Sequence, residues 1–491
     1  MSGMGASTER AVDDLNGCLL ASFKGPEPPP WLRRRLDHGL AGVMLRAANI
    51  TSPRQLRSLV GQLREHNPDV LIAVDEEGGV VTRVEAAAGS SYPGNAALGA
   101  VDDLALTRRV AVSIGAMLAA AGLNLNLAPV ADVSARHANP IIGVRSFGSE
   151  PSRVAAHTAA FVGGVQASNV AACAKHFPGQ GRAAADSHLE LPCVRATLPE
   201  LRAIDLEPFR AAIEAGVRSV MTGHIVYPDI DDAPATRSRV LLDGVLRREL
   251  GFEGVIITDS LGMAAIGDGA GTAAGAIRAL AAGADLMCLA PGEDALRRSA
   301  DTLSAAMHGG LVSRERVAEA AARVRALAEW ARPDPAADAD PAVGALAAAT
   351  ALRAEGVAVP LAGAPYVLDA GGRMSTQLEQ SSGSLLGLLR DRLPETDGVR
   401  LTERDALAGL DGRVAAAAGR ALVVVVKDAH WHDWQRELLG RVLGLRPDTL
   451  VVGTGTGYDR ALAGPAYLGT LGASRASLTA AADFLSGRAE S

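Results

Sequence analysis

The first 330 residues repeat one unit, in which a short apolar or β-branched run ends in a polar loop and precedes a longer helical stretch rich in Ala, Leu and Arg. This alternation predicts parallel βα units. Eight such strands in about 300 residues favour a (β/α)8 barrel of the TIM type, whose chemistry lies on the loops at the carboxyl ends of the strands. An open doubly wound sheet is the alternative, because it shows the same periodicity. The candidate strands are Leu15–Ser22, Gly42–Leu45, Val70–Val74, Asn124–Pro129, Ala171–His176, Ser219–Thr222, Val255–Thr258 and Ala284–Leu289.

A proline-rich stretch divides the chain. Trp330–Val343 contains three prolines among Asp and Ala and has no periodic apolar pattern, which is typical of a linker. We therefore predict a barrel domain over residues 1–330, a linker over 331–345 and a smaller α/β domain over 346–491. The strands expected in the smaller domain are Tyr366–Asp369, Ala421–Val426, Thr449–Val452 and Ala466–Leu468. The sequence GTGTG at Gly453–Gly457 lacks the features of a P-loop or a dinucleotide fingerprint, so we interpret it as a turn from a strand to a helix.

Composition excludes several classes of partner. The net charge of -7 and the pI near 5.9 provide no overall basic field for nucleic acid. No apolar stretch approaches the ~20 residues of a bilayer span, so no membrane partner is expected. The first 20 residues lack the basic flank and apolar core of a secretory signal, which predicts a cytoplasmic protein. Four scattered cysteines fit a reducing compartment, and we expect each of them to be a small buried residue.

Polar residues gather at the end of the fifth candidate strand and directly after it, in Ala174–His188. Pro178–Gly181 predicts a loop, which then presents Asp186 and His188 two residues apart. In an extended turn this pair can lie on one side, so the carboxylate can orient the imidazole while its other nitrogen faces a substrate. The alternatives are a purely structural loop and a metal site that includes His176, although neither HExxH nor a paired CxxC is present.

Two further strands end in acids. The apolar run Val255–Thr258 stops at Asp259, a carboxylate that is costly to bury unless it is hydrogen-bonded or in use. At the carboxyl end of a barrel strand, such an acid is predicted to be catalytic. Val70–Val74 is followed by acids and glycines, and Asp75 and Arg83 supply the acceptor and the donor fork that bind sugar hydroxyls. The alternative for Asp75 and Arg83 is an ion pair that closes a turn.

Six separated motifs identify a family. Together they closely resemble glycoside hydrolase family 3, in its bacterial β-N-acetylglucosaminidase branch, and they follow the family's order across the whole barrel region. The motifs are DEEGG…R at 75–83, NLNLAPVADV at 124–133, IGVRSFGSEP at 142–151, KHFPG…DSH at 175–188, MTGHIVYP at 221–228 and GFEGVIITDSLGM at 251–263.

The resemblance implies a retaining exo-β-N-acetylglucosaminidase that needs neither metal nor cofactor. Asp259 matches the family's nucleophile, and His188 with Asp186 matches its acid/base dyad. The implied substrates are N-acetylglucosaminides, including muropeptides and cell-wall fragments, and the smaller domain is expected to be the α/β sandwich that many members carry. The residues that match those holding the terminal sugar are Asp75, Arg83, Arg145, Lys175 and His176.

Two departures from the family pattern bear on substrate preference. Gln180 stands where close relatives often have His, and Ser260 follows Asp259 where they often have a second Asp. The alternatives that remain are an N-acetylglucosaminide phosphorylase, a family 3 β-glucosidase and a non-catalytic sugar-binding protein. A histidine acid/base is compatible with phosphorolysis because it does not repel an anionic acceptor as a carboxylate would. The sequence indicates no oligomeric state.

Overall fold

The computed structural model describes residues 13–134, 139, 141–183, 191–263, 271–372 and 383–488. The chain forms two compact units. The first comprises Met1–Glu76, Thr107–Ile142 and Gly148–Ala339. The second comprises Asp340–Ser491 together with two segments that come earlier in the chain, Glu77–Leu106 and Gly143–Phe147.

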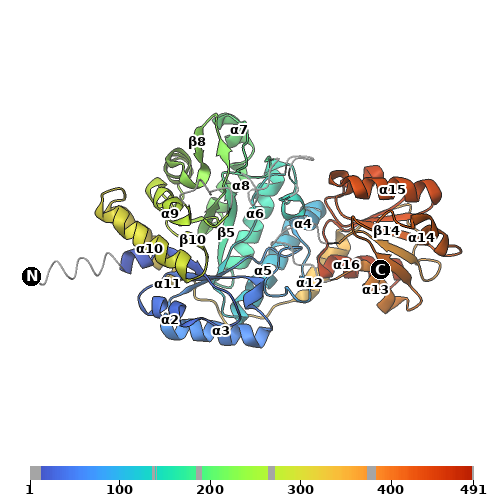
Figure 1. Ribbon diagram of the computed structural model, residues 1–491, viewed down its shortest axis with the longest axis horizontal. Coiled ribbons are helices and arrows are strands. Elements are labelled where there is room, and N and C mark those ends of the chain that lie inside the picture. The colour runs from blue at the N-terminus through green and yellow to red at the C-terminus, as the bar shows by residue number, and fades with distance from the viewer. Residues whose placement is uncertain are drawn as a thin grey trace, which may run out of the picture. The chain divides into compact units, whose positions relative to one another are not determined.

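The first unit is a barrel of eight parallel strands (Figure 1). Their order is β10-β1-β2-β3-β4-β5-β6-β9. A parallel bridge between Ile257 of β9 and Leu286, just before β10, closes the ring. The (β/α)8 prediction is therefore confirmed and the open doubly wound sheet is wrong. The strands are β1 (Leu19–Ser22), β2 (Gly42–Leu45), β3 (Leu71–Val74), β4 (Leu125–Asn126), β5 (Ala171–Phe177), β6 (Ser219–Thr222), β9 (Val255–Thr258) and β10 (Met287–Pro291).

Side chains from alternate strand positions fill the barrel, as the two-residue period of a strand requires. Leu71 and Ala73 of β3 point inward, as do Ala171 and Cys173 of β5. One face of the helix α11 (Arg314–Trp330) packs on the first residues of these strands and closes the amino end of the barrel. The carboxyl ends of the strands are therefore the end available for chemistry.

Helices surround the barrel strands (Figure 1). Among the helices of the described ranges, none combines the length and apolar composition that a membrane span requires. A short hairpin, β7 (Val226–Tyr227) with β8 (Asp231–Pro234), follows β6. The helices are η1 (Ala47–Asn49), η3 (Ala235–Arg237), the π-helix η4 (Val240–Glu249), α2 (Pro30–Asp37), α3 (Pro53–His66), α5 (Leu104–Ala120), α6 (Pro151–Gln166), α7 (Leu198–Ala203), α8 (Glu207–Glu214), α9 (Gly271–Ala282) and α10 (Glu293–His308).

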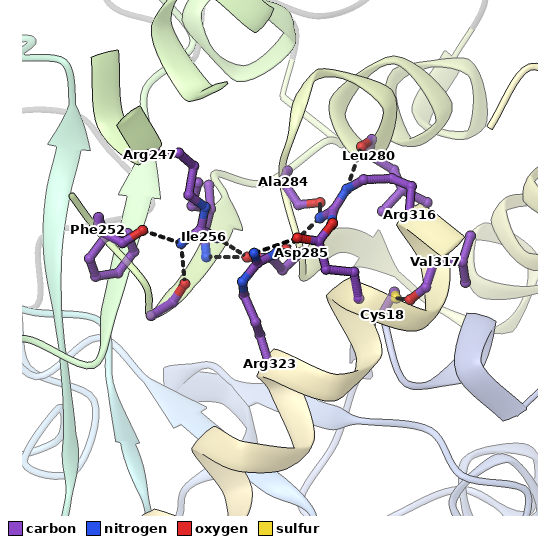
Figure 2. A network of polar contacts seen from close by, with 12 residues as sticks. Cys18, Arg247, Phe252, Ile256, Leu280, Ala284, Asp285, Arg316, Val317 and Arg323 are labelled. Carbon is purple, nitrogen blue, oxygen red and sulfur yellow. Dashed lines mark hydrogen bonds and ion pairs between the residues drawn. The ribbon is translucent and has the colours of Figure 1, made fainter. Parts of the chain in front are cut away.

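One buried carboxylate connects three elements at the amino end of the barrel (Figure 2). Asp285, which precedes β10, accepts hydrogen bonds from Arg247 of η4 and from the Ile256 amide of β9, the latter at 3.0 Å. Its other oxygen accepts from Arg316 at 2.5 Å and from Arg323 at 3.2 Å, both on α11. Since these partners lie on η4, β9 and α11, Asp285 holds α11 and η4 to the last strands of the barrel.

The second unit contains a six-stranded sheet in the order β11-β16-β15-β14-β12-β13, parallel except for the antiparallel pair β11 and β16. Helices cover both of its faces, α14 and α15 on one and α13 and α16 on the other, so the predicted α/β sandwich is confirmed. The strands are β11 (Arg353–Glu355), β12 (Tyr366–Asp369), β13 (Asp397–Arg400), β14 (Leu422–Val426), β15 (Leu450–Gly453) and β16 (Ala466–Gly469). The helices are η2 (Gly143–Arg145), η6 (Ala429–Trp431), η7 (Tyr458–Leu462), α4 (Asn95–Val101), α12 (Pro341–Thr350), α13 (Leu385–Arg392), α14 (Leu410–Ala416), α15 (Asp433–Leu445) and α16 (Arg475–Ser486).

Candidate active site

A buried ion pair joins two of the predicted sugar-binding residues of the barrel. The Lys175 Nζ atom on β5 donates to the Asp75 Oδ1 atom at 2.8 Å, although the two residues are 100 positions apart. Asp75 directly follows β3, and both side chains are at least 90% buried. Two charges out of water are tolerated because they neutralise each other at hydrogen-bond distance. The pair therefore holds a fixed acceptor and a fixed donor at the carboxyl ends of β3 and β5, across the intervening strand β4.

His176 is oriented by a carboxylate that the sequence analysis did not select. The fully buried Asp132 places its Oδ2 atom 2.8 Å from His176 Nδ1, and its Oδ1 atom accepts from the Gln180 amide at 2.6 Å. A carboxylate accepts only, so Nδ1 carries the proton of the neutral ring and Nε2 is left as the acceptor. Asp132 lies in the motif NLNLAPVADV, which was the available signal for it.

The loop that begins after β5 is tightly fixed at its start. Gly179 has φ +133°, and a Cβ atom there would lie 2.6 Å from the Asp205 side chain. A Cβ atom at Gly181 would lie 1.9 Å from the Val133 carbonyl oxygen, so only glycine fits. The Tyr227 hydroxyl donates to the Gly179 carbonyl oxygen at 2.6 Å. The loop prediction is confirmed for this part, whereas the predicted dyad of Asp186 and His188 lies outside the described residues.

Asp259 follows β9 directly and is half-buried. Its backbone amide donates to the Thr222 carbonyl oxygen at 3.2 Å, which ties it to β6. Its Oδ1 atom accepts from the Ser260 amide at 2.6 Å. These bonds hold the carboxylate at the carboxyl end of the barrel, next to the end of β6.

The fully buried His224 supports the segment around Asp259. Its Nε2 atom lies 3.0 Å from the Ser260 carbonyl oxygen and its Nδ1 atom 2.8 Å from the Thr236 hydroxyl. Burial lowers the pKa of His224, and the nearby Asp259 charge opposes this only in part. The ring is therefore neutral near neutral pH, donating through Nε2 and accepting through Nδ1. Sequence reasoning missed His224, although it lies in the quoted motif MTGHIVYP.

The other two predicted sugar-binding residues, Arg83 and Arg145, belong to the second unit and are buried. Arg145 forms a bidentate ion pair with Glu77, with Nε to Oε2 and Nη2 to Oε1 both at 2.8 Å. The Asn95 side chain donates to the Arg145 carbonyl oxygen at 2.7 Å. The guanidinium plane is thus fixed by the carboxylate of Glu77, a residue of the DEEGG motif whose role the sequence did not reveal.

The glycine-rich segment Gly453–Gly457 connects β15 to η7, so its interpretation as a strand-to-helix turn is confirmed. The Asp428 Oδ1 atom accepts from both the amide and the hydroxyl of Thr456 at 2.7 Å. A Cβ atom at Gly455 would lie 2.2 Å from that carboxylate. Because a carboxylate already occupies the loop, a phosphate would be repelled there.

The four cysteines are free thiols, three of them buried and one exposed. Burial raises the pKa of Cys18, Cys173 and Cys288 to about 12, as expected for inert buried thiols. Cys193 is exposed, so the expectation that all four are buried is wrong for this residue, which lies in a surface segment before β6. Within the described ranges, no group of three or more His, Cys, Asp or Glu side chains could hold a metal ion. Independence from metal stays a prediction.

Comparison with known proteins bears directly on this site. The model of the glycosyl hydrolase family 3 N-terminal domain matches residues 33–327. A β-hexosaminidase of Stenotrophomonas maltophilia is 40% identical over 276 residues, which cover 55% of this chain and 82% of that relative. The solved β-N-acetylglucosaminidase of Paenibacillus sp. FPU-7 superposes with a TM-score of 0.87 at 28% identity, over 97% of each chain.

A third relative is a shorter protein with a bound sugar analogue. NagZ from Neisseria gonorrhoeae, solved with N-trifluoroacetyl-D-glucosamine, is 30% identical and matches 64% of this chain and 98% of its own, with a TM-score of 0.54. The family match spans more than half of this chain and contains the carboxyl strand ends that carry Asp75, Lys175 and Asp259. The chain therefore belongs to glycosyl hydrolase family 3 and is a glycoside hydrolase.

Proposed function

We propose that the protein is a retaining exo-β-N-acetylglucosaminidase, which removes terminal β-linked N-acetylglucosamine through a covalent intermediate on Asp259. The position of Asp259 carries the proposal, since this half-buried carboxylate ends a strand of a family 3 barrel and its oxygen is held by the Ser260 amide at 2.6 Å. The likeness to relatives named β-hexosaminidase and β-N-acetylglucosaminidase supports the choice of sugar.

The reaction proceeds in two displacements. Asp259 attacks the anomeric carbon while His188, oriented by Asp186, protonates the departing oxygen, and the bond to the aglycone breaks. Neutral His188 then takes a proton from water, whose oxygen displaces Asp259 and restores the β configuration. An unperturbed imidazole titrates near ~6.5, so it can give and take this proton around neutral pH without the raised pKa that a glutamate acid needs.

Five side chains bind the terminal sugar in this proposal. The paired Asp75 and Lys175 offer an acceptor and a donor whose geometry is set before the sugar arrives, which lowers the entropy lost on binding. His176 offers its Nε2 atom, because Nδ1 is already bonded. Arg83 and Arg145 contribute donors, and the fixed plane of Arg145 suits hydroxyl oxygens.

The source of the substrate follows from the sequence resemblance. Muropeptides and other cell-wall fragments are the proposed substrates, and the proposed location is the cytoplasm. Water is the proposed acceptor. Phosphate is its competitor, since the proposed acid/base is a histidine and carries no negative charge that would repel an anion.

The test is turnover of 4-nitrophenyl N-acetyl-β-glucosaminide, with the first-formed anomer identified by NMR. We expect β-N-acetylglucosamine from the wild type and no turnover from Asp259→Ala. Asp294→Ala removes an exposed carboxylate paired with Arg297 at 3.4 Å and serves as the control with unchanged rate. A first product with the α configuration would contradict the retaining mechanism, and a sugar phosphate formed in phosphate buffer would replace water as the acceptor.

A further inference from the structure

The first turn of α16, the last helix of the second unit, is bonded to a loop from far earlier in the chain. The Arg475 Nε atom donates to the Gly89 carbonyl oxygen at 3.1 Å, across 386 positions. Its Nη2 atom donates to Glu85 Oε1 at 3.0 Å and to the Ser91 hydroxyl at 2.5 Å. One guanidinium thus contacts three residues of the loop Glu85–Ser91. A guanidinium spreads its donors over three nitrogens in a plane and so reaches separated partners, whereas lysine presents all its donors from one nitrogen atom.

The same loop is closed on itself by Glu85. The Ser91 amide donates to Glu85 Oε2 at 2.7 Å, and the Ser91 hydroxyl donates to Oε1 at 2.5 Å. The loop begins directly behind the predicted sugar-binding Arg83, where the Glu85 amide donates to the Thr82 hydroxyl at 3.2 Å. The backbone on either side of Arg83 is therefore fixed through Glu85, and Arg475 fixes Glu85.

The segment that carries Arg145 meets the same helix end. Val144, which precedes Arg145, packs in an apolar cluster with Val80, Val81 and Ala473, and Ala473 lies two residues before Arg475. Both predicted sugar-binding arginines of the second unit thus lie within two residues in sequence of a residue that packs or bonds with the start of α16.

We propose that Arg475 is a positioning residue for sugar binding, which holds the loop Glu85–Ser91 and through it the backbone of Arg83. The proposal rests on the proposed function, in which Arg83 contacts the sugar. Arg475 is 43% exposed and Glu85 19% exposed. An ion pair this accessible to water contributes little to folding stability, so its removal should disturb the loop and leave the fold intact.

The experiment compares Arg475→Ala and Arg475→Lys with Arg441→Ala in the full chain. Arg441, on α15 of the same unit, is 45% exposed and pairs with Asp411 at 3.2 Å, which makes it a matched control. For Arg475→Ala we expect KM for the aryl N-acetylglucosaminide to rise about three- to fivefold with kcat within about twofold, because ground-state binding is what the loop supports. The KM of Arg475→Lys should lie between those of the wild type and Arg475→Ala, and the KM of Arg441→Ala should match that of the wild type.

Hydrogen exchange gives a second readout that does not depend on activity. Amides of the segment from Thr82 to Ser91 should exchange faster in Arg475→Ala and not in Arg441→Ala. Unchanged exchange overturns the proposal, and so does faster exchange with an unchanged KM. A fall in kcat together with melting temperature would indicate a structural role and overturn it as well.

The wild type shows whether the proposed function fails, independently of the positioning role of Arg475. A wild type that does not turn over the glycoside contradicts the proposed function, and calorimetric affinity for N-acetylglucosamine then replaces KM in the comparison. A weaker affinity in Arg475→Ala alone would still support the positioning role. A wild type that neither hydrolyses the glycoside nor binds the sugar would contradict both proposals.

Discussion

Replacing Asp285 by Asn tests the charge network at the amino end of the barrel. The change keeps the volume of the side chain but removes the one charge shared by Arg247, Arg316 and Arg323 (Figure 2). Removing one partner of a buried ion pair costs about 3–5 kcal/mol. Arg323 is 27% exposed and can turn toward water, which favours the lower end of that range. For a unit of about 300 residues the entropy of unfolding is about 0.6 kcal/mol/K, so about 3 kcal/mol corresponds to a fall in Tm of about 5 °C.

The assay is differential scanning calorimetry of the barrel transition at neutral pH. Asp294→Asn, whose carboxylate is exposed and pairs with Arg297 at 3.4 Å, is the control and should shift Tm by less than about 2 °C. Adding Arg323→Gln to Asp285→Asn should recover about 1 kcal/mol, because it removes one of the three guanidiniums that repel one another once the Asp285 charge is gone, even though Arg323 keeps Glu319 as a partner at 2.6 Å. The charge argument would be refuted if the effects of the two substitutions on stability were additive. It would also be refuted if Asp285→Asn had the same Tm as the control Asp294→Asn.

Four further predictions follow from the site. A 2-fluoro sugar inactivator should label Asp259, and a labelled peptide elsewhere in the digest would exclude it as nucleophile. His188→Ala should slow glycosides with basic leaving groups by about 10²–10⁴-fold while sparing activated phenols, whereas an equal loss on every leaving group would refute a general-acid role. Since burial lowers the pKa of His224, the unfolded chain takes up a proton below pH ~6.5 that the folded chain does not bind. The free energy of unfolding therefore decreases as the pH is lowered through this range. In urea unfolding, the decrease in this free energy from pH 7.5 to pH 5.5 should be smaller for His224→Gln than for the wild type. Ellman's reagent should titrate only Cys193 in the native protein and all four cysteines in denaturant, because the other three thiols are buried with raised pKa values.

The sequence by itself determined where the strands lie and which residues end them. Val255–Thr258 is an apolar β-branched run bounded by turn residues, a local property, and the predicted strand matches β9. Asp259 was recognised because an acid that ends such a run is locally unusual. Among the described residues, sequence analysis missed four strands, the hairpin β7 and β8 and the strands β11 and β13 of the second unit. β11 and β13 are short and polar, and they form because they pair along existing edges of the sheet.

Only the tertiary structure decided how distant residues pair. Closure of the barrel depends on β10 pairing with β1, a contact between the ends of the domain that no local period encodes. Lys175 on β5 contacts Asp75 after β3, and His176 on β5 contacts Asp132 after β4, because the parallel strands of one barrel bring their carboxyl ends to the same end of it. Likewise, Glu77–Leu106 joins the second unit through contacts such as that of Arg475 with Glu85, which a reading of consecutive residues cannot foresee.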